Sequence, residues 1–154
     1  MNVLIVCSGN TCRSPMAGGI LAQIASTNGM DWSVRTAGLM HHPGRRVAEC
    51  AVTVLAELGI DISGEFSKPV DTEILDWADV VVPMTTSQAH FLTEDFPHVR
   101  AKLRLLGGDV DDPYLRPIES YREVRAVLEA LLLDLFQTMN RESATSNELH
   151  RNVE

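Results

Sequence analysis

Two residues near the start of the chain, Cys7 and Arg13, are separated by five residues. The residues between them are Ser8, Gly9, Asn10, Thr11 and Cys12, and Ser14 follows Arg13. When such a segment joins a strand to a helix, its backbone N–H groups can point inward and, with the guanidinium, bind an anion. Gly9 permits a tight turn, and Asn10 tolerates a left-handed backbone conformation. We therefore predict that residues 7–14, named the 7–14 loop, bind a phosphoryl group, with Arg13 contacting two of its oxygens.

The electrostatic field of this loop also acts on the Cys7 thiol. A free thiol has a pKa of about 8.5, and a helix N-terminus or an adjacent cation lowers that pKa by one to several units. We expect Cys7 to be largely thiolate at neutral pH, with the Ser14 hydroxyl donating a hydrogen bond to it. Such a thiolate can attack phosphorus and form a phosphocysteine that water hydrolyses. The alternative, a buried cysteine beside an unrelated arginine, is disfavoured by the combined spacing.

A carboxylic acid is also needed, because the leaving group must receive a proton. Asp112 lies in a loop rich in Gly, Asp and Pro, and Tyr114 follows closely enough to form a wall of the site. A bound phosphate dianion raises the pKa of a neighbouring carboxyl, which suits proton donation. An Asp-Pro pair alone is typical of a turn without chemistry, and we favour the acid role because Cys7 and Arg13 are present. Asp109 and Asp111 stay open as alternatives, and only geometry separates the three.

The elements that must hold these residues follow from hydrophobic periodicity. Apolar or alternating segments predict strands over residues 2–6, 32–36, 79–84 and 101–106. Apolar residues at helical spacing predict helices over residues 14–29, 46–58, 72–77, 86–95 and 120–139. Strands that alternate with helices predict a parallel sheet covered on both faces, with ligands bound beyond the carboxyl ends of its strands. The 7–14 loop lies at such an end.

Length and charge narrow the class of protein. The 154 residues contain no internal repeat, which predicts a single domain over residues 1–154, with residues 140–154 as a polar, fraying tail. The net charge of −8 argues against a nucleic-acid partner, whose phosphates need a basic surface. The N-terminus lacks the pattern of a secretory signal, and no apolar run is long enough to span a membrane. We expect a cytoplasmic protein without a membrane partner.

The cysteine count indicates free thiols rather than a disulfide framework or a metal site. The three cysteines are Cys7, Cys12 and Cys50, and no two of them are spaced as a C-x-x-C pair. The five histidines are scattered along the chain. We therefore predict no metal and no cofactor.

These motifs resemble the low-molecular-weight protein phosphatase family. The resemblance rests on the segment VCSGNTCRSPMA at residues 6–17, on Thr36-Ala37-Gly38, and on Asp112-Pro113-Tyr114. By order of elements it extends over roughly residues 1–139. It implies an α/β fold of the three-layer, flavodoxin-like type, with a central four-stranded parallel sheet.

The same resemblance implies roles for individual residues. Cys7 would be the nucleophile, Arg13 the phosphate ligand, and Asp112 the general acid and later the general base. Asn10 and Ser14 would shape the loop and stabilise the thiolate. Cys12 would be a redox-active resolving thiol, able to form a reversible disulfide with Cys7.

Thr11 and Tyr114 are the residues that we expect to determine the substrate. Members of the family that resemble protein arginine phosphatases carry threonine where many tyrosine-specific members carry isoleucine, and this chain has Thr11. Residues 39–43 lack the aromatic side chain that commonly walls a phosphotyrosine pocket, and Thr85 follows Met84 as in the arginine type. The resemblance thus implies hydrolysis of phosphoarginine in protein substrates.

Other functions are kept as alternatives. Protein-tyrosine phosphatase activity is the first of them. An arsenate reductase on the same fold would need two further cysteines, and only Cys50 lies outside the 7–14 loop. A non-catalytic phosphate-binding module would not need both Cys7 and Asp112.

Overall fold

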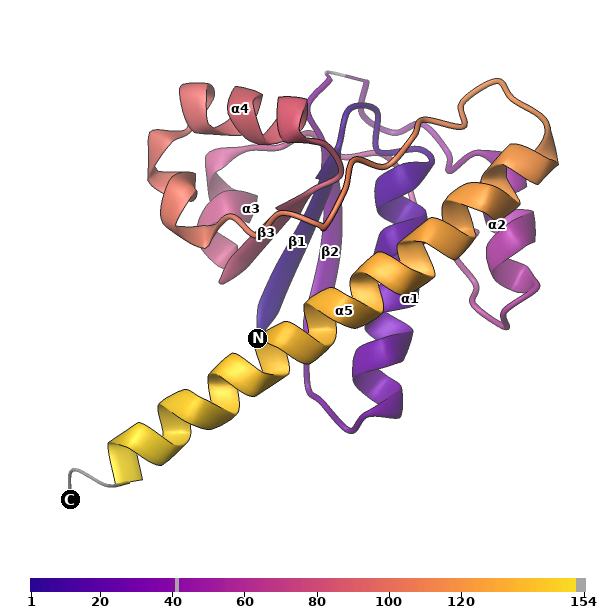
Figure 1. Cartoon of the computed structure of the whole chain (residues 1–154). Helices are drawn as coiled ribbons and strands as arrows, with labels where there is room; N and C mark the ends of the chain where they lie inside the picture. The colour runs from indigo at the N-terminus through magenta and orange to yellow at the C-terminus, as the bar shows by residue number, and fades with distance from the viewer. Residues whose placement is uncertain (41, 152–154) are drawn as a thin grey trace.

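The computed structural model describes residues 1–40 and 42–151 and contains a parallel three-stranded sheet. Its strands are β1 (Asn2–Cys7), β2 (Ser33–Gly38) and β3 (Val80–Pro83), in the order β2-β1-β3 (Figure 1). Cys7 pairs with Gly38 on one side, and Val6 pairs with Pro83 on the other. The carboxyl ends of all three strands therefore meet at one edge of the sheet, where the 7–14 loop begins.

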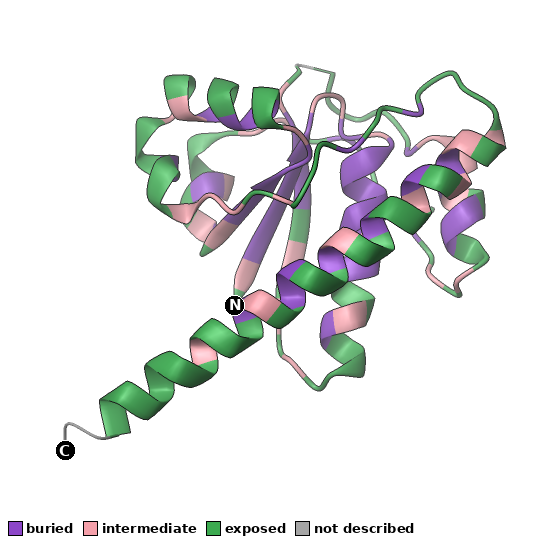
Figure 2. Cartoon of the chain, viewed as in Figure 1, coloured by how far each residue is buried: buried purple, intermediate pink, exposed green. Residues whose placement is uncertain are grey.

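Helices cover both faces of the sheet, as the sequence predicted. They are α1 (Arg13–Thr27), α2 (Glu49–Ala56), α3 (Thr72–Trp77), α4 (Thr86–Asp95) and α5 (Ile118–Arg151). On β1, Val3 and Ile5 belong to the core cluster that contains residues of α1, α2 and α5, whereas Leu4 and Val6 belong to the cluster beneath α3 and α4. Alternate side chains of one strand thus enter two cores, and the three-layer α/β fold is confirmed (Figures 1 and 2).

The predicted fourth strand over residues 101–106 is wrong for the described structure. Instead, a 3₁₀ helix, η1 (Pro97–Lys102), occupies the start of this segment. The chain then touches the sheet through one parallel bridge, between Val81 and Leu103, and the Arg104 N–H donates to the Val81 carbonyl at 3.0 Å. Pro97 lacks an N–H and favours the first turn of a helix, so only the end of the apolar segment is left to pair.

Helices 72–77 and 86–95 are confirmed, while the other three predicted helices have different bounds. The helix predicted over residues 14–29 is α1, which runs over Arg13–Thr27. The helix predicted over residues 46–58 begins later, at Glu49. The residues expected to form its first turn instead make backbone contacts with distant segments. Arg46 forms an antiparallel bridge with Phe66, and the Ala48 N–H donates to the Thr11 carbonyl at 2.9 Å. The strand predicted over residues 32–36 runs from Ser33 to Gly38.

The last helix does not end at Met139, so the expected polar tail is helical as far as Arg151. No proline or glycine interrupts these residues, and Glu142 on this extension forms an ion pair with Arg104. Most of the extension is exposed beyond the body of the domain (Figure 2). The polar composition of residues 140–151 therefore indicates that they are exposed to solvent, and it does not indicate that the helix ends before them. Among the helices of the described residues, none is both long and apolar enough to cross a membrane.

Candidate active site

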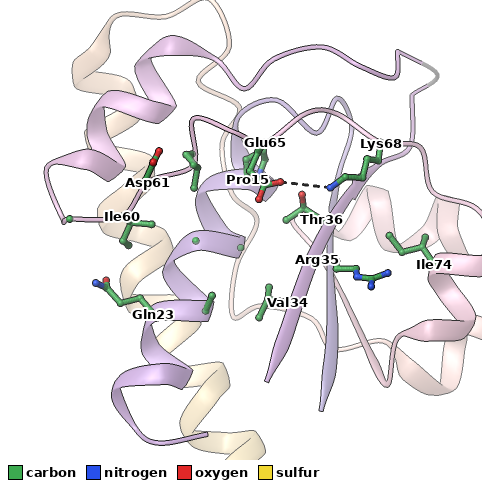
Figure 3. A pocket seen from close by; sticks show the side chains of 15 residues that line it. Pro15, Gln23, Val34, Arg35, Thr36, Ile60, Asp61, Glu65, Lys68 and Ile74 are labelled. Carbon is green, nitrogen blue, oxygen red and sulfur yellow. Dashed lines mark ion pairs between the residues drawn. The ribbon is translucent and has the colours of Figure 1, made fainter. Parts of the chain in front are cut away.

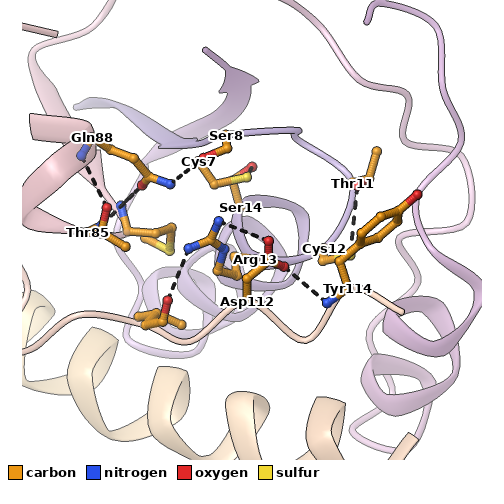
Figure 4. Close-up of polar contacts among 12 residues, drawn as sticks. Cys7, Ser8, Thr11, Cys12, Arg13, Ser14, Thr85, Gln88, Asp112 and Tyr114 are labelled. Atoms are coloured by element: carbon orange, nitrogen blue, oxygen red, sulfur yellow. Dashed lines mark hydrogen bonds and ion pairs between the residues drawn. The ribbon is translucent and has the colours of Figure 1, made fainter. Parts of the chain in front are cut away.

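The 7–14 loop connects the end of β1 to the start of α1 and surrounds the Cys7 sulfur (Figure 4). Asn10 has a φ of 55°, so the predicted left-handed position is confirmed. Its backbone N–H donates to the Cys7 Sγ at 3.2 Å, and the Ser14 Oγ lies 3.0 Å from the same sulfur. The sulfur is therefore held between two polar groups that can donate hydrogen bonds to it.

The Asn10 side chain fixes the hydrogen-bond direction around that sulfur. Its Nδ2 donates to the Ser14 Oγ at 2.8 Å and to the Thr36 Oγ1 at 2.9 Å. Since the Ser14 oxygen accepts from Asn10, its own proton is left to point toward the Cys7 Sγ. The Lys68 N–H donates to the Asn10 Oδ1 at 2.9 Å, so three of the side chain's hydrogen-bonding positions are used.

Close packing against β2 explains why Gly38 ends the Thr36-Ala37-Gly38 motif. A Cβ at Gly38 would lie 3.0 Å from the Asn10 Cβ and 3.0 Å from the Ser8 carbonyl oxygen. Any side chain there would push the 7–14 loop away from the sheet. The motif thus allows the close approach that lets Asn10 reach Thr36.

Arg13 is buried, and its guanidinium is held by two contacts from the loop before α5. Its Nη1 donates to the Val110 carbonyl at 3.1 Å, and its Nη2 lies 3.5 Å from the Asp112 Oδ2. The Arg13 side chain is only 8% exposed, whereas that of Asp112 is 51% exposed. The arginine is therefore fixed in place, and the carboxylate keeps access to solvent and to a substrate.

Geometry separates Asp112 from the two neighbouring carboxylates. Asp109 accepts hydrogen bonds from both the N–H and the hydroxyl of Thr86, each at 2.9 Å, and therefore stabilises the first residue of α4. Asp111 lies along a different cavity, with Arg116. Asp112 alone of the three lies on the same cavity as Cys7, and the Tyr114 N–H donates to its Oδ1 at 3.1 Å.

A cavity of about 140 Å³ collects most of the predicted site residues. Its lining consists of Cys7, Ser8, Gly9, Thr11, Cys12, Arg13, Met40, His42, Arg45, Asp112 and Tyr114. Sequence reasoning considered residues 39–43 as a pocket wall but gave His42 no role, and it missed Arg45, which belongs to no motif. A larger cavity of about 600 Å³ lies between α1, β2 and residues 59–68 (Figure 3), and none of Cys7, Arg13 and Asp112 lines it. The smaller cavity is therefore the candidate active site.

Cys12 differs from Cys7 in its surroundings. It is buried, and its Sγ lies 3.5 Å from the Tyr121 hydroxyl of α5. Burial raises the pKa of the Cys12 thiol, and the Tyr121 hydrogen bond only partly opposes that rise. Cys12 is thus an uncharged thiol at neutral pH. All three cysteines are free in this structure, and the redox role of Cys12 stays a prediction.

Gln88 on α4 braces the 7–14 loop and was not anticipated. Its Oε1 accepts from the N–H groups of Met84 and Thr85 at 3.0 and 3.1 Å, and its Nε2 donates to the Ser8 Oγ at 3.1 Å (Figure 4). The spacing of Thr85 and Gln88 fits a capping box, which the sequence could have indicated. The reach of the amide to Ser8 depends on the tertiary fold.

Replacing Gln88 by alanine is expected to lower kcat/KM for phosphorylated substrates by about tenfold, because Ser8 and the Thr85 N–H lose their partner, whereas the Met84 N–H keeps the Val6 carbonyl at 3.0 Å. The loss of buried hydrogen bonds should also cost about 1–3 kcal/mol in the free energy of unfolding. Steady-state kinetics and denaturant unfolding measure the two effects. Ser87→Ala, an exposed neighbour on α4, is the control and should change neither. An unchanged kcat/KM in Gln88→Ala would show that the brace does not position the loop.

Comparison with known proteins agrees with this geometry. Residues 2–145 match the family described as low molecular weight phosphotyrosine protein phosphatase. The protein-arginine-phosphatase of Bacillus subtilis (strain 168) is 34% identical over 149 residues, which cover 92% of this chain and 99% of that protein. The chain belongs to the low molecular weight phosphotyrosine protein phosphatase family.

Two solved structures show the likeness in three dimensions. A YwlE arginine phosphatase, a C7S mutant with a phosphorylated active site serine, superimposes with a TM-score of 0.87 at 33% identity, covering 91% of this chain and 96% of that one. A low molecular weight protein tyrosine phosphatase from T. tengcongensis superimposes with a TM-score of 0.85 at 39% identity, covering 90% and 99%. The relatives therefore include proteins named for both phosphoarginine and phosphotyrosine chemistry.

Proposed function

We propose that this protein hydrolyses phosphoarginine in protein substrates through a phosphocysteine intermediate on Cys7. One observation carries the proposal: Cys7, Arg13, Asp112 and Thr11 line a single cavity at the carboxyl end of β1. The relatives named protein-arginine-phosphatase support the choice of phosphorylated side chain. The three free thiols suit the reducing cytoplasm, where we place the activity.

In the first step the Cys7 thiolate attacks the phosphorus from the floor of the cavity. The backbone N–H groups of the 7–14 loop and the Arg13 guanidinium hold the phosphoryl oxygens and stabilise their charge in the transition state. The S–P bond forms while the P–N bond breaks. The electron pair of the P–N bond goes to the guanidine nitrogen, which takes the proton of Asp112.

In the second step water hydrolyses the phosphocysteine. Asp112, now a carboxylate, takes a proton from the water while the oxygen of the water attacks the phosphorus. The S–P bond breaks, inorganic phosphate leaves, and the Cys7 thiolate is restored. The Ser14 hydroxyl, 3.0 Å from the sulfur, stabilises the thiolate as a leaving group.

Thr11 is the residue that we assign to discrimination between phosphoarginine and phosphotyrosine. Its carbonyl is held by the Ala48 N–H at 2.9 Å, so the residue has a fixed place in the cavity wall. The hydroxyl can accept a hydrogen bond from the substrate guanidinium, whereas isoleucine would replace it with hydrocarbon and fill part of the cavity. A site that hydrogen-bonds its substrate discriminates strongly against analogues that lack the group.

The substitution Thr11→Ile is expected to lower kcat/KM for phosphoarginine peptides by about 10–100-fold while leaving phosphotyrosine peptides within about threefold. The measurement is phosphate release from two peptides of the same sequence that differ only at the phosphorylated residue. Thr11→Ser, which keeps the hydroxyl, is the matched control and should retain the phosphoarginine preference. If Thr11→Ile leaves that preference intact, the role given to the threonine is wrong.

Phosphotyrosine hydrolysis is the second candidate, because the T. tengcongensis relative at 39% identity is named a protein tyrosine phosphatase. Tyr114 is 45% exposed on the cavity, where it could pack against an aryl ring. The arsenate reductase alternative is not favoured, since Cys50 of α2 packs against the core. A binding module without catalysis would retain phosphate and release none.

A further inference from the structure

Arg45 is an exposed cation on the wall of the catalytic cavity. Its Nη2 lies 3.4 Å from the Tyr114 hydroxyl, which is a neutral partner. Within residues 1–40 and 42–151, Arg45 makes no ion pair, whereas Arg104, Arg122 and Arg125 are each paired with a glutamate. In a chain of net charge −8, an unpaired cation at this place is available to a ligand.

The backbone of Arg45 is held firmly despite the exposure of its side chain. The buried Ser67 hydroxyl accepts from the Arg45 N–H at 2.8 Å and donates to the His42 carbonyl at 2.6 Å. The Ser67 N–H donates to the Arg45 carbonyl at 2.8 Å. The Cα of Arg45 therefore has a fixed position relative to the cavity, and only the side chain is free to adjust.

The contact between Arg45 and Tyr114 also joins two separate walls. Arg45 belongs to the segment that precedes α2, and Tyr114 to the segment that carries Asp112. In the inner part of the cavity, the positive charge of Arg13 is already paired with the carboxylate of Asp112, with 3.5 Å between Nη2 and Oδ2. Arg45 adds a positive charge outside that pair, on the same cavity. The exposed Arg46 beside it has the same sign.

We infer that Arg45 selects substrates in which an acidic residue neighbours the phosphorylated side chain. The inference rests on the proposed function, because it names a feature of the substrate of that same site. With the phosphoryl group in the 7–14 loop, the substrate backbone passes the outer wall of the cavity, where the guanidinium can pair with a carboxylate in its planar fork geometry. A basic residue at the same place in the substrate would be repelled.

The test compares phosphoarginine peptides that carry Glu or Lys on both sides of the phosphorylated residue, with a matching pair of phosphotyrosine peptides. For the unmodified protein, kcat/KM should be about fivefold higher for the Glu peptide, mainly through KM, because an exposed ion pair acts on binding and is modest in strength. High salt should reduce the preference. Arg45→Glu should reverse it. Arg100→Glu on η1, with the same charge change on an exposed residue outside the cavity, should keep it.

Equal kcat/KM for Glu and Lys peptides in the unmodified protein would overturn the inference, as would a Glu preference that survives Arg45→Glu. The phosphotyrosine pair separates this failure from a failure of the proposed function. If only phosphotyrosine peptides are hydrolysed, the assigned substrate class is wrong, and the Glu-to-Lys ratio in that pair still tests Arg45. A binding measurement of the same peptides to Cys7→Ser gives the preference independently of turnover.

Discussion

Replacing Cys7 by serine is expected to lower kcat/KM for every phosphorylated substrate by roughly 10⁴-fold or more, the scale on which loss of a catalytic nucleophile acts. The reason is chemical, because a serine hydroxyl is a weak nucleophile without a base beside it. The partners of the sulfur are the Ser14 hydroxyl and the Asn10 N–H, and neither is a base that could activate a serine. The measurement is phosphate release from phosphoarginine peptides at neutral pH.

The control for this prediction is Cys50→Ser. Cys50 is a free cysteine on α2 that does not line the catalytic cavity, so its replacement should leave kcat/KM within about twofold. Cys7→Ser should still bind vanadate or phosphate, since the loop N–H groups and Arg13 are retained. More than a few per cent of the original activity in Cys7→Ser would mean that another group attacks the phosphorus.

Replacing Asp112 by asparagine is expected to lower kcat for phosphoarginine peptides by about 10³-fold, within the usual range for loss of a general acid. Guanidine is a strongly basic leaving group, so cleavage of the P–N bond depends on proton donation. An aryl phosphate with an acidic phenol depends on it much less and should lose less than about tenfold. Asparagine has nearly the same shape and can still accept from the Tyr114 N–H, so the loop should keep its conformation.

The neighbouring Asp111→Asn is the matched control for Asp112→Asn. It removes one carboxylate from the same loop, but Asp111 lies on a different cavity, and turnover should stay within about twofold. If Asp112→Asn slows both substrates equally, the carboxylate acts by holding Arg13, 3.5 Å away, and not by donating a proton. If it slows neither, the general acid is a different group.

The layers of the fold could be predicted from the sequence because local patterns determine them. The apolar segment of β1 alternates between two cores, and a strand with apolar side chains on both faces requires helices on both. The pairing of residues 101–106 could not be read in this way. The pairing depends on where η1 ends. Because η1 extends to Lys102, only Leu103 forms a bridge with β3, at Val81.

The position of the candidate-site residues around one loop could be predicted because they lie in short motifs with demanding backbone geometry. Asn10 in the left-handed region and Gly38 against the loop both follow from residue type. Arg45 and Gln88 could not be found, because their relation to the site is set by contacts between distant segments. Ser67 holds Arg45 in place across 22 residues, and Gln88 reaches Ser8 across 80.

The most direct test of the central claim is a competition experiment with the unmodified protein. A phosphoarginine peptide and a phosphotyrosine peptide of otherwise identical sequence, mixed at equal concentration, compete for one site, and their relative rates of loss give the ratio of kcat/KM. Mass spectrometry over time should show the phosphoarginine peptide consumed first, with no loss beyond one equivalent of protein for Cys7→Ser. Faster loss of the phosphotyrosine peptide, or repeated turnover of either peptide by Cys7→Ser, would contradict the account.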